Sequence, residues 1–256
     1  MNITFIISTL NDGIFKIPEE NFYKLKNVII VHQVTDGNDY SYFVNKYNEK
    51  KSNIKYLVMN EKGLSKSRNK GLDNCSTEWA YILDDDVLVY DDILDKLETE
   101  TNSENSVFTF YHSDVDETVY KKYKKKRFNH NVISLAKVAS IDLFLNVSLI
   151  NKKNIRFDEN FGLGTKYPSG EEYILLTDCL DKKIKVINIP VFTTKHPNEA
   201  SGNDFFSSVE KISSKKMMFN RLRTPFSKIL KIMFLIKKIY PLVKNKSLLK
   251  FMKHYL

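Results

Sequence analysis

The sequence predicts an α/β fold whose sheet is largely parallel, and two observations indicate it. Over the first hundred residues, apolar strand-like runs alternate with stretches that can form helices. The second observation is an acidic triplet, Asp84–Asp86, that directly follows the fourth run. Ligands of α/β sheets bind outside the carboxyl ends of the strands. We therefore expect a functional site where the fourth strand ends.

The expected elements follow one another in a regular order. Strands are expected at 3–8, 28–32, 54–59 and 79–83, with helices near 19–26, 40–51, 64–74 and 91–100. Further strands are expected at 107–111 and 184–192, with an apolar, β-prone segment at 140–150. A lysine-rich run, 120–127, is expected to be a solvated loop because like charges repel. Residues 161–172 form a glycine-bearing loop that leads into a short helix at 173–180.

Composition fits a globular protein in a reducing compartment. The 256 residues are 42% hydrophobic and can bury a full core. Cys75 and Cys179 have neither metal-ligand spacing nor a disulfide pattern, so small buried thiols are expected. The first residues lack a basic leader and a cleavage pattern, and we expect them to form the first strand rather than a signal peptide.

Charge divides the chain into two parts. The last 46 residues, 211–256, hold 13 Lys and Arg but no Asp or Glu, although the whole chain has a net charge of +9. The remaining 27 basic and 31 acidic residues give the body a net charge of −4. We therefore predict a catalytic domain at 1–210 and a basic tail at 211–256. A basic stripe of this kind binds nucleic acid or anionic lipid.

The tail contains a predicted amphipathic helix at 228–243. At 100° per residue, one face collects seven apolar side chains, and Lys228, Lys231 and Lys238 are expected on its flank. The apolar residues are Ile229, Ile232, Met233, Ile236, Ile239, Tyr240 and Val243. Lysines interrupt the run before it reaches the length of a membrane span. The helix can lie in a bilayer interface, or it can pack on the body or on a partner.

The acidic triplet indicates a metal–phosphate site. Adjacent carboxylates repel one another and are costly to desolvate, so stability alone does not explain them beside a buried strand. Mg²⁺ or Mn²⁺ would neutralise them, and these ions commonly bind together with a phosphate.

Three motifs together resemble the inverting glycosyltransferases of family 2, which have the GT-A fold. The motifs are Gly63-Leu64-Ser65-Lys66-Ser67-Arg68-Asn69-Lys70-Gly71, the strand ending in Asp84-Asp85-Asp86, and Phe161-Gly162-Leu163-Gly164 with Gly170-Glu171-Glu172. They occur in the family's order and at fitting spacing over about residues 2–200. The resemblance implies a GT-A α/β mixed sheet flanked by helices. It also implies a nucleotide-sugar donor, with a UDP-sugar as the first expectation, and Mn²⁺ or Mg²⁺ as cofactor.

The resemblance also assigns the donor side of the site. Asp84 would lie near the ribose or base, Asp86 would bind the metal and Asp85 would support one of these roles. Arg68 would reach the base or diphosphate, and Thr9 belongs to the first strand end, where the family binds the base. At the second strand end the chain departs from the family's acidic pair, and either Gln33 or Asp36 could contact the base.

On the acceptor side, an inverting transfer needs a carboxylate that takes the proton of the attacking hydroxyl. The family match favours Glu172 as this base, with Glu171 positioning the acceptor. His196 follows the last strand, where a histidine completes the metal shell in many GT-A enzymes, and neutral imidazole suits Mn²⁺.

The expected function is therefore sugar transfer to a glycan hydroxyl, with a polyprenyl-diphosphate-linked acceptor in bacterial surface polysaccharide synthesis. Together with the family resemblance, the basic tail leads us to expect this reaction at the cytoplasmic face of the cell membrane, with the protein bound peripherally and no nucleic acid as partner. Two alternatives stay open. One is a haloacid-dehalogenase-like phosphatase, although Leu88 stands where that family's motif has Thr or Val. The other is a non-catalytic nucleic-acid- or membrane-binding module on a degenerate enzyme fold.

Overall fold

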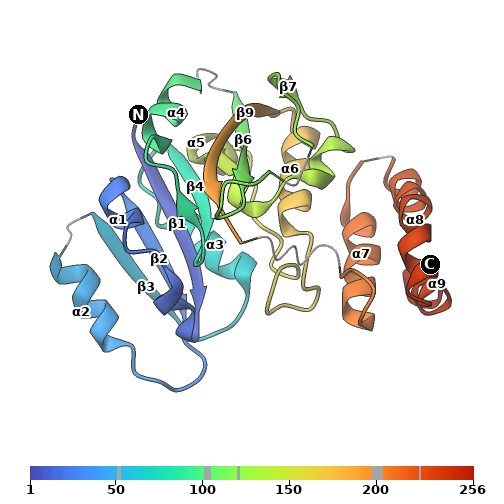
Figure 1. Cartoon of the computed structure of the whole chain (residues 1–256), viewed down its shortest axis with the longest axis horizontal. Helices are drawn as coiled ribbons and strands as arrows, with labels where there is room; N and C mark the ends of the chain where they lie inside the picture. Colours follow the sequence, from blue (N-terminus) through green and yellow to red (C-terminus); the bar gives the residue numbers. More distant parts are fainter. Residues whose placement is uncertain (51–52, 101–104, 120–121, 198–203, 225) are drawn as a thin grey trace.

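A mixed sheet runs through the computed structural model of the chain, which describes all residues except 51–52, 101–104, 120–121, 198–203 and 225. Among the described residues the sheet has nine strands, in the order β3-β2-β1-β4-β8-β6-β9-β5, with β7 paired to β9. Helices cover both of its faces (Figure 1). The chain thus has the α/β layer that the alternation in sequence predicts, although the sheet is mixed beyond its parallel half.

The first half of the sheet is parallel and matches the predicted strands closely. It consists of β1 (Ile3–Leu10), β2 (Val28–Gln33), β3 (Ile54–Met59) and β4 (Trp79–Asp84). Strand β1 lies between β2 and β4 and pairs in parallel with both. The carboxyl ends of these strands therefore meet at one edge, and Ser8 is directly opposite Asp84.

The second half brings distant segments of the chain together. It consists of β5 (Leu88–Val89), β6 (Ser106–Ser113), β7 (Phe128–Asn129), β8 (Leu143–Asn146) and β9 (Lys185–Lys195). Strand β8 is antiparallel to both β4 and β6, whereas β6 and β9 are parallel. The short β5 pairs antiparallel with the end of β9 and places Leu88 opposite Lys195.

Two apolar clusters hold the helices on the sheet. Alternate residues of β1 supply them, since side chains of a strand point to opposite faces: Phe5 and Ile7 enter one cluster and Ile6 enters the other. The first cluster holds α1 (Asn21–Lys24), α2 (Ser41–Lys50) and α4 (Ile93–Glu100). The second holds α3 (Leu64–Asp73), α5 (Val147–Lys152) and α6 (Glu171–Asp181).

Three local expectations need correction. The β-prone segment 140–150 is only in part a strand, because the Asn146 side chain accepts a hydrogen bond from the Leu149 N–H (2.8 Å) and starts α5 there. The helix expected at 19–26 shortens to the four residues of α1, since Leu25 is already extended. Of the lysine-rich run, 122–127 is irregular and largely exposed as expected, whereas Tyr120 and Lys121 lie outside the described residues.

The tail forms three helices beyond α6: α7 (Val209–Arg221), α8 (Ser227–Lys244) and α9 (Leu248–Tyr255). Figure 1 shows α7 next to the body, with α8 and α9 at the far end of the molecule. Helix α7 shares the second apolar cluster through Ile212 and Met218, and Arg221 on it forms ion pairs with Asp158 (2.6 Å) and Asp178 (2.9 Å) of the body. The predicted division between residues 210 and 211 falls inside this helix.

The orientation of α8 corrects the predicted lysine flank. The seven apolar side chains of the predicted face are exposed, whereas Leu230 and Leu242 on the opposite side are buried. The ammonium groups of Lys231 and Lys238 lie over the rings of Tyr255 (5.4 Å) and Phe205 (4.8 Å). These two lysines therefore face α9 and the segment before α7, and only Lys228 of the predicted three stays exposed at the edge of the apolar face.

Candidate active site

The acidic triplet lies at the carboxyl end of β4, where the sequence places it. Asp84, the last residue of β4, is partly buried, and its Oδ1 accepts a hydrogen bond from Arg68 Nη2 at 2.7 Å. Its other oxygen lies 3.4 Å from the Ser140 hydroxyl, which donates to it. Asp84 is thus held between α3 and the segment before β8, facing inward from the edge of the sheet.

Arg68 links the two halves of the site. Its side chain is fully buried, and its Nη1 donates to Glu171 Oε1 at 2.9 Å while Nη2 binds Asp84. The guanidinium also packs 5.5 Å from the ring of Phe157, and within the described residues its Nε has no hydrogen-bond partner. Both terminal nitrogens of Arg68 are thus directed at carboxylates, and its predicted contact with the nucleotide stays a prediction.

The motif around Arg68 is tied to the acceptor-side loop by its polar residues. The Ser65 hydroxyl donates to the Phe161 carbonyl at 2.6 Å, and the Asn69 side chain both donates to the Phe157 carbonyl and accepts from its N–H. Gly71 allows α3 to approach β1, because a Cβ there would lie 2.4 Å from Ile6 Cγ2. The motif therefore positions Arg68 and joins α3 to the acceptor-side loop on one side and to β1 on the other.

Asp85 points toward the end of β1. Its Oδ2 accepts a hydrogen bond from the Thr9 hydroxyl at 2.6 Å, and a Cβ on Gly13 would lie 2.2 Å from the same oxygen. Burial raises the pKa of Asp85, and the charges of Asp86 and Asp84 raise it further. Thr9 and Asp85 are thus brought together as neighbours, and their predicted contacts with a donor stay a prediction.

Asp86 and His196 meet although 110 residues separate them in sequence. His196 Nε2 lies 3.3 Å from Asp86 Oδ1. The cause is the pairing of β5 with β9, because Leu88 opposite Lys195 places the preceding residues beside the residue after β9. The hydrogen bond between the two groups lowers the pKa of Asp86 and raises that of His196.

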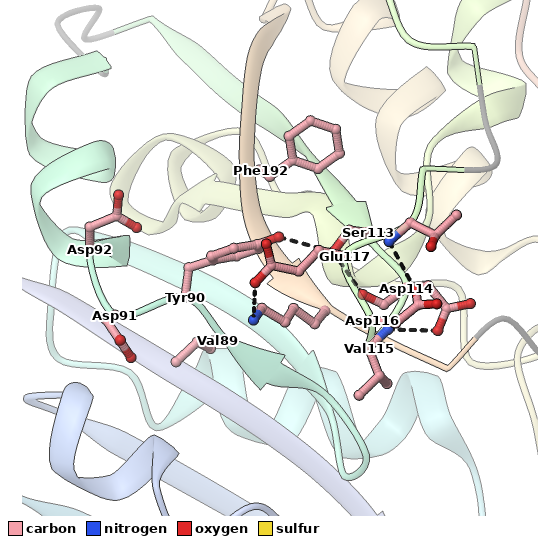
Figure 2. A network of polar contacts seen from close by, with 12 residues as sticks. Val89, Tyr90, Asp91, Asp92, Ser113, Asp114, Val115, Asp116, Glu117 and Phe192 are labelled. Carbon is pink, nitrogen blue, oxygen red and sulfur yellow. Dashed lines mark hydrogen bonds and ion pairs between the residues drawn. The ribbon is translucent and has the colours of Figure 1, made fainter.

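The end of β9 is fixed by the turn that follows β6. The His196 N–H donates to the Ser113 carbonyl at 3.0 Å, and Lys195 Nζ pairs with Glu117 Oε1 at 2.6 Å. Figure 2 shows this turn beside Tyr90, whose hydroxyl is 3.0 Å from Ser113 Oγ. The same lysine lies 4.7 Å from the centre of the Tyr90 ring. These contacts hold the backbone that carries His196.

A carboxylate and an imidazole at this spacing fit one divalent cation. Adjacent ligands of an octahedral ion with bonds of about 2.1 Å lie roughly 3 Å apart, close to the 3.3 Å between Asp86 and His196. Within the described residues no group of three or more His, Cys, Asp or Glu side chains is arranged to hold a metal. Two protein ligands suit Mn²⁺ or Mg²⁺ where substrate phosphates and water supply the others.

Glu171 and Glu172 begin α6 and have different environments. Glu171 is buried and paired with Arg68. Burial raises the pKa of Glu172 to about 8, and the charge of Glu171 raises it further. Gly170 before them has φ of 103°, in the left-handed region, and a Cβ there would lie 2.8 Å from Met218 Sδ of α7. Helix α7 therefore packs directly against the start of α6.

Lys215, one turn before Met218 on α7, is a site residue that the sequence did not reveal. Burial lowers its pKa, while the charges of Glu172 and Glu171 oppose that shift. Conversely, the Lys215 charge lowers the pKa of Glu172. In sequence it is one of 13 basic residues of the tail. Only the pair of adjacent acids at the start of α6 could have indicated that a cation was needed there.

Gln33 and Asp36, the two candidates for contact with the nucleobase, differ in how exposed their side chains are. Gln33 is buried, its Oε1 accepting from the Gly63 N–H at 2.7 Å and its amide donating to the Thr9 carbonyl at 3.4 Å. These bonds connect β1, β2 and the start of α3, so Gln33 serves the fold in this structure. Asp36 is exposed and accepts from the Tyr40 hydroxyl at 2.7 Å. Of the two, Asp36 has the accessible carboxylate.

The mixed α/β sheet, with acids at the end of β4 and at the start of α6, agrees with the GT-A fold that the three motifs predict. The family model described as glycosyl transferase family 2 matches residues 15–167, and the chain belongs to this family. The resemblance read from the three motifs is thereby confirmed. The family assignment also leaves the phosphatase alternative without support.

Solved structures of S. aureus TarS are similar to this chain. The structure of TarS residues 1–349 superposes with a TM-score of 0.63 at 14% identity over 86% of this chain. The same fragment in complex with UDP-GlcNAc gives 0.65 at 13% identity over 86% of this chain and 66% of that one. The complex with UDP gives 0.61 at 16% identity over 91% and 69%, respectively. The chain spans 65% of the length of the first fragment, and no curated protein matches it.

Proposed function

We propose that the protein is a metal-dependent, inverting glycosyltransferase that moves a sugar from a UDP-sugar to a hydroxyl of a glycan acceptor. The observation that carries the proposal is the buried guanidinium of Arg68, which binds Asp84 on one side and Glu171 on the other. It places the end of β4 and the start of α6 on either side of one rigid group. A donor bound at the end of β4 and an acceptor bound at the start of α6 would then be held in a fixed orientation to each other.

A UDP-sugar is the proposed donor. The fold it shares with TarS, which has been solved with UDP-GlcNAc and with UDP, supports this choice. In this chain the uridine would lie at the ends of β1 and β2, with the exposed carboxylate of Asp36 as the candidate contact. Asp84 and Asp85, fixed by Arg68 and Thr9, would line the ribose and diphosphate side.

Asp86 and His196 would hold Mn²⁺ or Mg²⁺. When bound, the cation supplies positive charge that stabilises the diphosphate as it leaves. The protein's part is to present the two ligands at the correct spacing, which the β5–β9 pairing and the contacts of Ser113 and Glu117 achieve.

Glu172 is the proposed general base. Arg68 holds the Glu171 carboxylate in place, whereas burial raises the pKa of Glu172, which gives it the proton affinity that a base acting near neutral pH needs. Glu172 would take the proton of the acceptor hydroxyl, whose oxygen forms a bond to the anomeric carbon. The bond from that carbon to the diphosphate breaks on the opposite face, and UDP leaves with the bonding electrons. The new linkage has inverted configuration.

We propose a polyprenyl-diphosphate-linked glycan of a bacterial capsule, O-antigen or exopolysaccharide, glycosylated at the cytoplasmic face of the cell membrane. Support comes from the tail, whose 13 cationic residues are unaccompanied by any acid, and from its contact with the acceptor side through Met218 and Gly170. An anionic lipid-linked substrate would be attracted to such a surface.

Incubation with Mn²⁺ and a panel of nucleotide sugars tests the reaction. We expect UDP release from one UDP-sugar, loss of this activity with EDTA, and a rate lower by about 10²–10⁴ for Glu172→Gln. In the same assay, Asp86→Asn should remove the stimulation of UDP release by Mn²⁺. Asp92→Asn, which changes an exposed acid paired with Lys96 on α4, is the matched control and should leave the rate unchanged. If no nucleotide sugar binds, the non-catalytic alternative replaces this proposal.

A further inference from the structure

Helix α8 exposes an apolar face that no described part of the chain covers. The seven apolar side chains of the predicted face, which run from Ile229 to Val243, have exposed fractions of 44% to 74%. At 100° per residue they span an arc of about 120° on the side opposite Leu230 and Leu242. A helix that is apolar on both faces normally has both faces covered. Helices α7 and α9, together with Phe205, cover one face of α8, so a second contact is expected on the other.

Lysines border this apolar face on both sides. Lys228 lies about 20° beyond one edge of the arc, and Lys237 and Lys244 lie about 20–40° beyond the other. All three are exposed, in contrast to Lys231 and Lys238, whose ammonium groups lie over the rings of Tyr255 and Phe205. An apolar stripe between two rows of cations is the pattern of helices that lie in the headgroup region of anionic bilayers.

We propose that this α8 face, bordered by Lys228, Lys237 and Lys244, docks the protein on an anionic lipid bilayer with the helix axis parallel to the membrane plane. No helix in the described part of the chain is long and apolar enough to cross a membrane. The apolar side chains would enter the boundary between headgroups and acyl chains, and the lysines would contact anionic headgroups. The inference rests on the membrane location proposed above, but it is independent of the sugar-transfer site.

Charge argues against a second copy of the chain as the occupant. A twofold dimer pairs the same patch of both subunits. Here that would bring two sets of lysines together on tails that contain no acidic residue from 211 to 256. Like charges in an interface are repulsive, whereas an anionic bilayer complements both the apolar stripe and its cationic borders.

Co-flotation of the full chain with vesicles tests the proposal. We expect binding to phosphatidylglycerol-containing vesicles, weak binding to pure phosphatidylcholine vesicles, and release as salt rises. Ile232→Ser/Ile236→Ser should weaken binding at least about tenfold, since it removes two apolar anchors. The matched control, Val58→Ser/Ile133→Ser, changes two exposed aliphatic residues outside α8 and should bind as the wild type does.

A second pair of variants tests the cationic borders. Lys228→Gln/Lys237→Gln/Lys244→Gln should lose binding to anionic vesicles, whereas Lys26→Gln/Lys153→Gln/Lys185→Gln, with the same charge change on the body, should retain most of it. Equal binding of the α8 variants and their controls overturns the proposal. So does a wild-type dimer in sedimentation without lipid that Ile232→Ser/Ile236→Ser converts to a monomer. UDP-sugar turnover measured without lipid should be the same for all four variants, which separates this inference from the catalytic proposal.

Discussion

At the scale of single residues, Arg68 is the group on which the site depends most. It is a fully buried cation between two carboxylates, so Arg68→Met leaves Asp84 and Glu171 without their partner. Removing one member of a buried pair costs about 3–5 kcal/mol of unfolding free energy. Urea denaturation measures this loss. Arg156→Met removes an exposed ion pair with Asp73 and should cost less than about 1 kcal/mol; equal losses would contradict the role given to Arg68.

Lys215 gives the site a pH dependence that can be tested. A general base works only when deprotonated, so kcat/KM should fall as pH drops through the pKa of Glu172, which burial holds above its ordinary value. The Lys215 charge lowers that pKa. Lys215→Met should therefore move the acid limb of the profile to higher pH. Lys215→Arg should restore its position, and Lys216→Met, the adjacent residue, serves as control. An unmoved limb in Lys215→Met would show that Lys215 does not act on the base.

The residue assignments show what the motifs can and cannot give. The motifs predicted which side chains gather, and Asp86 and His196 do meet at 3.3 Å. They could not predict where each side chain points, because that depends on partners from other elements. Arg68 turns to Glu171, which is 103 residues away, and Gln33 to the Gly63 N–H. Long-range pairing of this kind leaves no local signal in a single sequence.

At the scale of elements, α3 positions the site through its close approach to β1. Gly71→Ala would place a Cβ 2.4 Å from Ile6 Cγ2, so the helix has to move away from the sheet. Overpacking of this kind costs about 1–3 kcal/mol. Ile6→Ala also destabilises the protein, but it removes the clashing methyl group. In a double-mutant cycle by urea denaturation, the double variant should lose less than the sum of the single losses; simple additivity would exclude the clash.

Periodicity predicted elements best where one physical pattern dominates. Strands β1 to β4 match the predicted ranges almost residue for residue, and β1, β2 and β4 do so because buried parallel strands need continuous apolar runs. The segment 140–150 was not, because a single cap at Asn146 turns an apolar run into a helix. In α8 the periodicity predicts the apolar face correctly but not which side of the helix is covered by the rest of the fold. Both sides of that helix are apolar, and tertiary contacts with Phe205 and Tyr255 decide the orientation.

At the scale of the whole molecule, the family motifs predicted the fold that the sheet order shows, including strands absent from any motif. The role of the tail was less predictable. Charge composition separates residues 211–256 from the body, yet α7 begins at Val209 and carries apolar residues of the same core cluster that contains α3 and α6. Composition reports what a segment exposes to solvent, whereas packing depends on the few residues that it buries.

Truncation tests whether the tail is an appendage or part of the folded body. A chain ending at residue 208 loses α7, including Met218 against Gly170 and the Arg221 ion pairs with Asp158 and Asp178. It should melt well below the full chain, since each 1 kcal/mol lost lowers Tm by about 2–4 °C for a protein of this size. A chain ending at residue 226 keeps α7 and should melt between the two. Thermal unfolding followed by circular dichroism gives this order. Equal melting temperatures for the full chain and the chain ending at 208 would instead support an independent tail, because the body would then be complete without α7.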